Sequence, residues 1–166
     1  MLKKNLSLTL TLLVLVMGGC TTDEKPAPAA STPPPSPDIV YAQGFYDLER
    51  DASMTWRWME PEAVVRLKNT GKDMVLKFSG RAPIEKFKQP PVITLSLNGA
   101  QLDQMKGTPE MLNREFTITP AQQGKAEWSE LKISSDKSFV PKEVDPGGTD
   151  PRKLAFSLTK LSWEAK

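Results

Sequence analysis

Residues 93–102, ITLSLNGAQL, decide the fold class of this chain. Apolar and polar residues alternate from Ile93 to Leu97, which is the pattern of a strand with one buried face. Asn98-Gly99 follows directly, and this dipeptide favours a two-residue hairpin turn because both residues tolerate a positive φ. A second run begins immediately after the turn. The stretch therefore predicts an antiparallel hairpin.

The same period of two residues extends over most of the chain from residue 39 onward. It appears in the runs 63–68, 74–78, 93–98, 116–118, 128–133 and 154–158. Leu161 and Trp163 continue the last run one position out of step, which indicates a β-bulge. Residues 69–72, NTGK, predict a second, slightly longer hairpin turn. Prolines between the runs are incompatible with long helices, and only a short helical turn is expected near residues 83–87.

These patterns predict an all-β fold for residues 39–166, taken as one domain. About eight short antiparallel strands in a chain of this length are typical of an antiparallel β-sandwich, and we expect the jelly-roll type. A domain of this size can bury a sufficient core without help from a metal or a disulfide.

The N-terminus has the features of an export signal. Two lysines and an apolar run over residues 6–17 precede two glycines and a cysteine. Residues 17–20, MGGC, resemble the lipobox of bacterial lipoproteins. The resemblance implies that residues 1–19 are a signal peptide removed before Cys20, that the Cys20 thiol carries diacylglycerol, and that the new amino group is acylated. The apolar run of about a dozen residues is too short to span a bilayer, which takes about 20.

The N-terminal leader also predicts where the protein is located in the cell. Lipid chains at Cys20 would anchor the protein to a membrane of the cell envelope. Thr21, rather than Asp, follows the cysteine, and this resembles Gram-negative lipoproteins that travel to the outer membrane. Residues 20–38 are rich in proline and contain no aromatic or branched aliphatic residue, so they predict a flexible tether.

Composition excludes several classes of function. The chain has no histidine and one cysteine, which excludes Ser-His-Asp catalysis, His- or Cys-based metal sites and an internal disulfide. Its 22 Lys and Arg residues nearly balance its 20 Asp and Glu residues, so no nucleic-acid partner is expected. Asp136, Asp145 and Asp150 lack the spacing of an EF-hand loop and are interpreted as solvated loop acids. We expect no metal and no cofactor.

The densest group of aromatic and charged residues lies between residues 46 and 58. With one residue near the C-terminus, it supplies the candidate ligand-binding residues Tyr46, Glu49, Trp56, Arg57, Trp58 and Arg152. If residues 54–59 form a strand, Trp56 and Trp58 share one face and Arg57 points to the other. Flat aromatic rings stack on the C–H faces of sugars, while Arg and Glu side chains bind hydroxyl groups, so the composition suits a glycan site.

Structural roles for the same residues stay open at this point. At least one of the two tryptophans could fill the core between the sheets, and Arg57 could form an ion pair with Glu49 or Glu60. Arg152 and Asp150, in a loop before the last strands, could pair with this group or cap the end of a sheet.

Several short motifs resemble, as a set, an accessory β-sandwich domain. They are Gly44-Phe45-Tyr46, Glu49-Arg50, Trp56-Arg57-Trp58-Met59, Leu95-Ser96-Leu97-Asn98-Gly99, Phe139-Val140-Pro141 and Asp150-Pro151-Arg152-Lys153-Leu154. The domain they resemble occurs at the ends of bacterial membrane glycosyltransferases and in free-standing lipoproteins. The resemblance covers residues 44–164 and implies an extracytoplasmic sandwich. It transfers no glycosyltransferase activity, because this chain has no catalytic domain of that kind.

The leading hypothesis is a lipid-anchored, non-catalytic β-sandwich that binds a glycan or another envelope component. A second hypothesis is a protein-interaction or structural module that docks an envelope protein through an edge strand or an apolar patch. A third is a glycoside-active enzyme that uses a pair such as Glu49 and Glu60. We expect no catalytic residue, because the sequence lacks a recognisable nucleophile motif as well as histidine.

Overall fold

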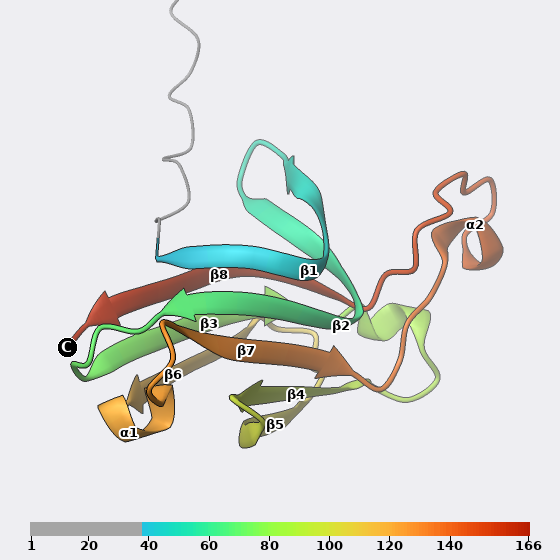
Figure 1. The fold of residues 1–166 in the computed structure, drawn as a ribbon. Coiled ribbons are helices and arrows are strands. Elements are labelled where there is room, and N and C mark those ends of the chain that lie inside the picture. The colour runs from blue at the N-terminus through green and yellow to red at the C-terminus, as the bar shows by residue number, and fades with distance from the viewer. Residues whose placement is uncertain (1–37) are drawn as a thin grey trace, which may run out of the picture. The chain divides into compact units, whose positions relative to one another are not determined.

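The computed structural model describes residues 38–166, so the predicted signal peptide, Cys20 and nearly all of the tether lie outside the described residues. The described part is built from strands (Figure 1). These are β1 Ile39–Arg50, β2 Thr55–Lys68, β3 Met74–Arg81, β4 Val92–Leu97, β5 Ala100–Lys106, β6 Leu112–Ile118, β7 Trp128–Ser135 and β8 Phe156–Ala165. Single helical turns occur at η1 Ile84–Lys86, α1 Pro120–Gln123 and α2 Pro141–Val144. No helix within residues 38–166 has the length and apolarity needed to cross a bilayer.

The strands form two antiparallel sheets that share β1 and β2. Residues 62–68 of β2 pair with β7, whereas residues 57–59 pair with β8. β1 follows β2 along both parts, through residues 39–43 and then residues 45–50. The first sheet is therefore β1-β2-β7-β4-β5, and the second sheet is β1-β2-β8-β3-β6. Strands that pass from one sheet to the other form the corner of a sandwich, and Figure 1 shows both strands bending together.

The order of the strands confirms the predicted fold class. The chain passes from one sheet to the other between β3 and β4, between β5 and β6, between β6 and β7, and between β7 and β8. Repeated crossing between two antiparallel layers is the connectivity of a jelly roll. All strand pairs are antiparallel, as the sequence predicted.

Gly44 makes the corner in β1 possible. Its φ is +74°, and a Cβ at this position would lie 2.1 Å from the carbonyl oxygen of Glu62. Only glycine combines a positive φ with such a close approach of two backbones. In β2, Pro61 lies at the same corner, between the segment that pairs with β8 and the segment that pairs with β7.

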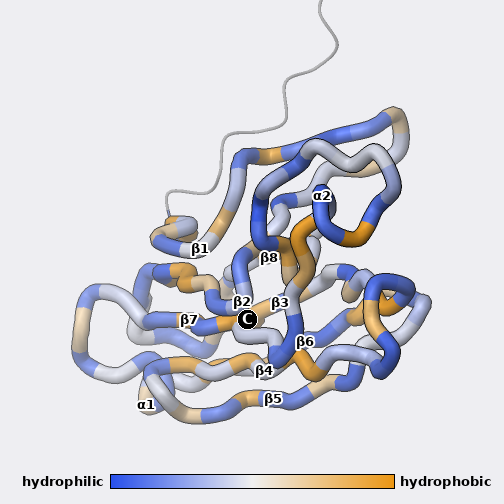
Figure 2. The backbone as a smooth tube through the Cα atoms, turned by 90° about the vertical axis from the view of Figure 1, so that its right-hand side faces the viewer, coloured by the Kyte–Doolittle hydropathy of each residue, from blue (hydrophilic) through white to orange (hydrophobic). Residues whose placement is uncertain are grey.

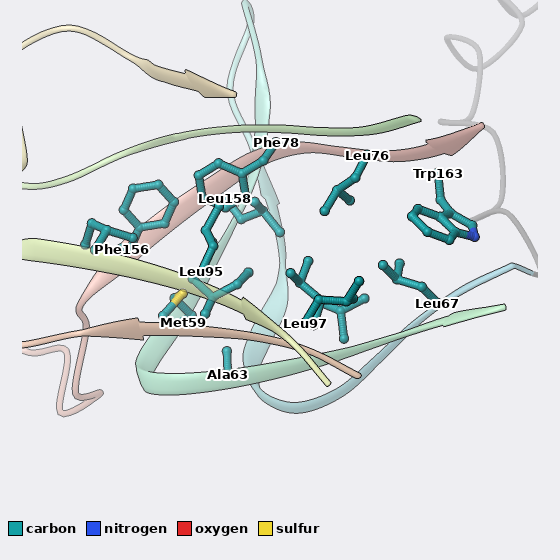
Figure 3. Packing of buried hydrophobic residues seen from close by; sticks show 14 of the residues in the cluster. Met59, Ala63, Leu67, Leu76, Phe78, Leu95, Leu97, Phe156, Leu158 and Trp163 are labelled. Carbon is teal, nitrogen blue, oxygen red and sulfur yellow. The ribbon is translucent and has the colours of Figure 1, made fainter. Parts of the chain in front are cut away.

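The core lies between the two sheets (Figure 3). The second sheet contributes Leu76, Phe78, Phe156, Leu158 and Trp163, and the first sheet contributes Ala63, Leu67, Leu95 and Leu97, with Met59 near the corner. The Phe78 and Phe156 rings stack with centroids 5.5 Å apart. The Trp163 indole N–H donates to the Lys68 carbonyl at 2.7 Å, so this tryptophan buries its ring and satisfies its polar group. Figure 2 shows hydrophobic and hydrophilic positions alternating along the strands.

Local predictions from turn chemistry are largely confirmed. Asn98 and Gly99 both have positive φ, at 50° and 83°, and connect the paired strands β4 and β5. The bulge expected near the end of the chain is Thr159, because Leu158 pairs with Gly80 while Lys160 already pairs with the preceding Ser79. The helical turn expected near residues 83–87 is η1.

The hairpin predicted at residues 69–72 is wrong. This segment connects β2 to β3, but β2 pairs with β1, β7 and β8, and β3 pairs with β6 and β8. The Asn69 side chain instead binds the segment before β7, because its amide donates to the carbonyls of Gln123 and Ala126 at 2.8 and 2.9 Å. Asn and Gly residues mark a turn here, but they do not determine which strands the turn connects.

Candidate functional site

β2 presents Trp56 and Trp58 on the outer face of the second sheet. Met59 between the sheets is fully buried, and side chains alternate along a strand, so both tryptophans lie on the face away from the core. Both are half-buried. Neither ring fills the core, so the structural alternative for these two residues is wrong, and Trp163 is the core tryptophan of the second sheet.

The two rings line a surface hollow of about 540 Å³, which we call the Trp hollow. Strand residues in its lining are Trp56 and Trp58 of β2, Ser157 and Thr159 of β8, and Arg81 of β3. These strands are neighbours in the second sheet, and Ser157 pairs with both Trp58 and Arg81. Cross-strand partners place their side chains on one face, so these strand residues form a continuous surface of the hollow.

Three loops complete the lining of the Trp hollow. Met54 comes from the turn between β1 and β2, Glu85 from η1, and Met111 from the segment before β6. The two methionine side chains are 44% and 36% exposed, so their apolar surface is accessible to a ligand in the hollow. Apolar walls with a few polar groups are typical of ligand sites.

Charged groups in the lining are available for hydrogen bonds. Arg81 donates to the Pro109 carbonyl at 3.4 Å and has no ion-pair partner among residues 38–166. The Asp51 carboxylate accepts the backbone N–H groups of Ser53 and Met54 at 2.7 and 2.8 Å. These bonds, together with the Ser53 hydroxyl, lower the pKa of Asp51, so this carboxylate is ionised at neutral pH.

An aromatic group supports Trp58 from the side. The Phe139 ring meets Trp58 edge-on with centroids 6.1 Å apart, and Phe87 meets Phe139 in the same way at 6.1 Å. The Lys86 ammonium lies 5.7 Å from the centre of the Phe139 ring and forms an ion pair with Asp145. Packing of this kind limits the rotamers of Trp58 and so keeps the ring orientation defined.

Arg152 holds a second group together, the Arg152 cluster of Tyr46, Glu49, Asp150 and Arg152. The guanidinium contacts Glu49 at 2.6 Å and Asp150 at 2.8 Å, and its carbon lies 5.2 Å from the centre of the Tyr46 ring. Hydrogen bonds from Arg152 lower the pKa of Asp150, and both carboxylates raise the pKa of Arg152. Pairing of Asp150 and Arg152 with the residues near 46–58, one of the two alternatives, is therefore confirmed.

The six candidate residues do not form a single site. Tyr46, Glu49 and Arg152 belong to the Arg152 cluster and do not line the Trp hollow. Arg57 points to the other face of β2, as the strand pattern predicted. Its guanidinium lies 4.9 Å from the centre of the Tyr41 ring and donates to the Tyr46 carbonyl at 3.2 Å.

Arg57 lies on the face of β2 that is turned toward the core. Its strand partner Leu158 is a core residue, so Arg57 faces the interior at the edge of the sandwich. The suggested ion pair of Arg57 with Glu49 or Glu60 is wrong, since Glu49 pairs with Arg152 and no carboxylate of the described residues lies within 4.0 Å of Arg57. Burial raises the pKa of the nearby Tyr41 hydroxyl.

Three loop acids each have a separate partner. Asp136 accepts the backbone N–H of Val92 at 2.6 Å, Asp145 pairs with Lys86, and Asp150 pairs with Arg152. Within the part of the chain that the structure describes, no three acidic side chains gather to hold a metal ion.

Stability should depend on pH through the Asp150–Arg152 pair. Because the folded-state pKa of Asp150 is lowered, its stabilising contribution is complete above the ordinary value of 3.8 and is lost as the pH falls through the folded-state pKa. We expect Asp150→Asn to lower the free energy of unfolding near neutral pH, and we expect this loss to shrink as the pH falls below 3.8 and through the folded-state pKa. Urea unfolding across this range measures the difference.

A double-variant cycle isolates this contribution. In an Arg152→Ala background, the effect of Asp150→Asn on the free energy of unfolding should vary less with pH, because the side-chain hydrogen bonds and the charge of Arg152 are gone and only the backbone N–H of residue 152 still lowers the pKa of Asp150. A difference between parent and Asp150→Asn that stays constant down to acid pH would contradict the assignment.

Comparison with known proteins gives distant similarity only. No protein-family model and no curated protein match the sequence. The fold is similar to a family 35 carbohydrate binding module from Clostridium thermocellum, with a TM-score of 0.44 and 10% identity over 78% of this chain and 93% of that one. A family 35 carbohydrate binding module from an environmental isolate gives 0.40 and 11% over 77% and 93%. At TM-scores below 0.5, these two similarities leave the ligand of this chain open.

Sequence reasoning missed Arg81, Glu85 and Met111 in the Trp hollow. Arg81 ends a strand whose alternation was recognised, so its outward direction could have been inferred from the buried Phe78 and Gly80. Glu85 and Met111 come from irregular segments, and no periodic signal places such residues beside a given strand.

Proposed function

We propose that this chain is a lipid-anchored, non-catalytic β-sandwich that binds a glycan of the cell envelope in the Trp hollow. The observation that supports this best is the pair Trp56 and Trp58, which lie two residues apart on one face of β2 within an open hollow of about 540 Å³. Concave sites lined by aromatic side chains together with a few polar groups are typical of small-molecule binding sites.

The lining fits the chemistry of a sugar. A pyranose has apolar C–H faces, which the indole rings can cover, and a rim of hydroxyl groups, which need donors and acceptors. Arg81 offers N–H groups without a competing carboxylate within ion-pair distance, and Glu85 offers carboxylate oxygens in the same lining. An aromatic surface combined with directed hydrogen bonds gives both affinity and orientation.

The non-catalytic part of the proposal draws on Asp51. A glycosidase needs one carboxyl group with a raised pKa to protonate the leaving oxygen. Asp51 is the acid of the lining that is bound by backbone N–H groups, and its pKa is lowered. It is therefore a poor proton donor. The sequence also lacks histidine and a recognisable nucleophile motif, and we expect no release of reducing ends when the protein is incubated with glycans.

The anchoring part of the proposal rests on the sequence. The lipobox-like residues 17–20 predict a lipid on Cys20, and the proline-rich residues 20–38 would then separate the domain from the membrane. A site on a tethered domain can reach polymers near the membrane surface. Mass spectrometry of the purified N-terminus would show diacylglycerol and acyl chains on Cys20, and an unmodified Cys20 would contradict this part.

The binding proposal can be tested by electrophoresis of the full-length chain in native gels that contain envelope or capsular polysaccharides. We expect at least one polysaccharide to retard the chain. If none does, and a pull-down from solubilised membranes recovers a stoichiometric protein partner that survives excess sugar, the protein-interaction hypothesis replaces this one.

A further inference from the structure

A second hollow lies on the same outer face of the second sheet. Its volume is about 270 Å³, and its lining is Lys77, Ser79, Asn113, Arg114, Glu115 and Lys160. These side chains are polar or charged, and none is aromatic. The hollow can therefore form hydrogen bonds with a ligand but cannot stack on a sugar ring as the Trp hollow can.

The two hollows adjoin each other along the strands. Ser79 precedes Arg81 by two residues on β3, so both side chains lie on one face about 7 Å apart. Asn113 follows Met111 by the same step, and Lys160 follows the bulge residue Thr159. In each of these pairs, one residue lines the Trp hollow and the other lines the second hollow.

Register places the polar residues of the second hollow side by side. Ser79 pairs with Asn113 of β6 on one side and with Lys160 of β8 on the other. Met111 and Thr159 meet at the junction of the hollows, where the Thr159 hydroxyl lies 3.4 Å from the Met111 sulfur. A methionine side chain is unbranched and adaptable, so a ligand that crosses this junction meets a flexible apolar surface.

Charged groups along this face carry no positive excess. In the second hollow, Arg114 pairs with Asp103 at 2.6 Å and Lys77 pairs with Glu164 at 3.5 Å. The Lys160 ammonium has no hydrogen-bond or ion-pair partner among residues 38–166, and Arg81 in the Trp hollow has no ion-pair partner there either. Against these two cations stand the carboxylates of Asp51, Glu85 and Glu115, from the linings of the two hollows. No excess of positive charge favours a polyanion, whereas each group can bind a hydroxyl.

From this arrangement we infer that the ligand is an extended, uncharged glycan chain, with one sugar in the Trp hollow and the following sugars over Met111 and the second hollow. This inference rests on the proposed function and adds the class of ligand. The inferred site would bind several successive sugars in the interior of a polymer. A site for a single sugar or for a chain end would not need the second hollow.

The probe is the polysaccharide that retards the full-length chain most strongly, partially hydrolysed and fractionated by length. Calorimetric titration should show affinity rising from disaccharide to longer fragments. Lys160→Ala and Asn113→Ala should each lower affinity for the long fragments about fivefold to tenfold, equivalent to one lost hydrogen bond, and leave the affinity for the disaccharide unchanged. Lys132→Ala is the matched control, because this lysine lies on β7 of the first sheet.

Two kinds of outcome distinguish failure of this inference from failure of the proposed function. If the disaccharide binds as tightly as the polymer, or if affinity falls steeply with added salt as for an anionic ligand, the extended uncharged chain is wrong while the glycan site stands. If no polysaccharide binds, or if Trp58→Ala binds fragments of every length as the parent does, the proposed function itself fails and this inference with it.

Discussion

Gly44→Ala is expected to lower the free energy of unfolding by about 3 kcal/mol or more. The added Cβ would lie 2.1 Å from the Glu62 carbonyl oxygen and 2.9 Å from the Ala63 Cα, and the residue would still need a φ of +74°. Both contacts are with backbone, which cannot rotate away. The corner in β1 and β2 would have to open, and the packing between the two sheets depends on this corner.

Gly71→Ala is the matched control for this change. Gly71 has a φ of +69°, but no atom lies within 4 Å of the position of its Cβ. Gly71→Ala should lower the free energy of unfolding only by the cost of holding an alanine in the left-handed conformation, about 1 to 2 kcal/mol. Urea unfolding of the two variants separates the clash from the conformational cost. Equal losses would show that the approach of β1 to Glu62 does not hold the corner.

Trp58→Ala is expected to lower affinity for a bound glycan about 30-fold or more, equivalent to about 2 kcal/mol for the removal of an aromatic side chain at the centre of a site. The ring lines the Trp hollow and contacts the edge of Phe139, and it lies outside the core. The variant should therefore remain folded, which thermal unfolding would verify before any titration.

Trp128→Ala is the control for the loss of a tryptophan. Trp128 is also half-buried, but it lies on β7, and Arg66 and Lys68 each approach its ring to 5.1 Å. It does not line the Trp hollow. Affinity measured by calorimetry should match that of the parent. If Trp128→Ala and Trp58→Ala weaken binding equally, the assignment of the site to the second sheet is wrong.

Local features of the fold could be predicted from the sequence because they depend on neighbouring residues. The alternation from Ile93 to Leu97 and the Asn98-Gly99 turn define a hairpin without reference to the rest of the chain. The shift between Leu158 and Leu161 likewise records a bulge within one strand. Each of these signals spans only a few residues, and each is confirmed in the structure.

The arrangement of the two sheets could not be predicted in this way. The patterns at residues 54–59 and 63–68 predict two separate strands, but they belong to one strand, β2, that serves both sheets. The corner between them depends on contact between Gly44 and Glu62. Long-range contacts of this kind leave no periodic signal, and the same limitation explains the wrong hairpin at residues 69–72.

In the candidate site too, the direction of side chains along a strand could be predicted, whereas contacts between residues far apart in the sequence could not. Strand alternation placed Trp56 and Trp58 on one face and Arg57 on the other, and the structure confirms this. Grouping all six candidates into one site was wrong, because a short stretch of sequence does not reveal which side chains bond to distant residues. Arg152 binds Glu49 from a segment about a hundred residues away.

The central claim, that the Trp hollow binds a glycan, is tested most directly by tryptophan fluorescence of the full-length chain titrated with the retarding polysaccharide. All four tryptophans contribute to the emission, and two of them line the hollow. We predict a saturable shift that is retained in Trp128→Phe and lost when Trp56 and Trp58 are both replaced by Phe. A shift that persists unchanged in this double variant would contradict the account.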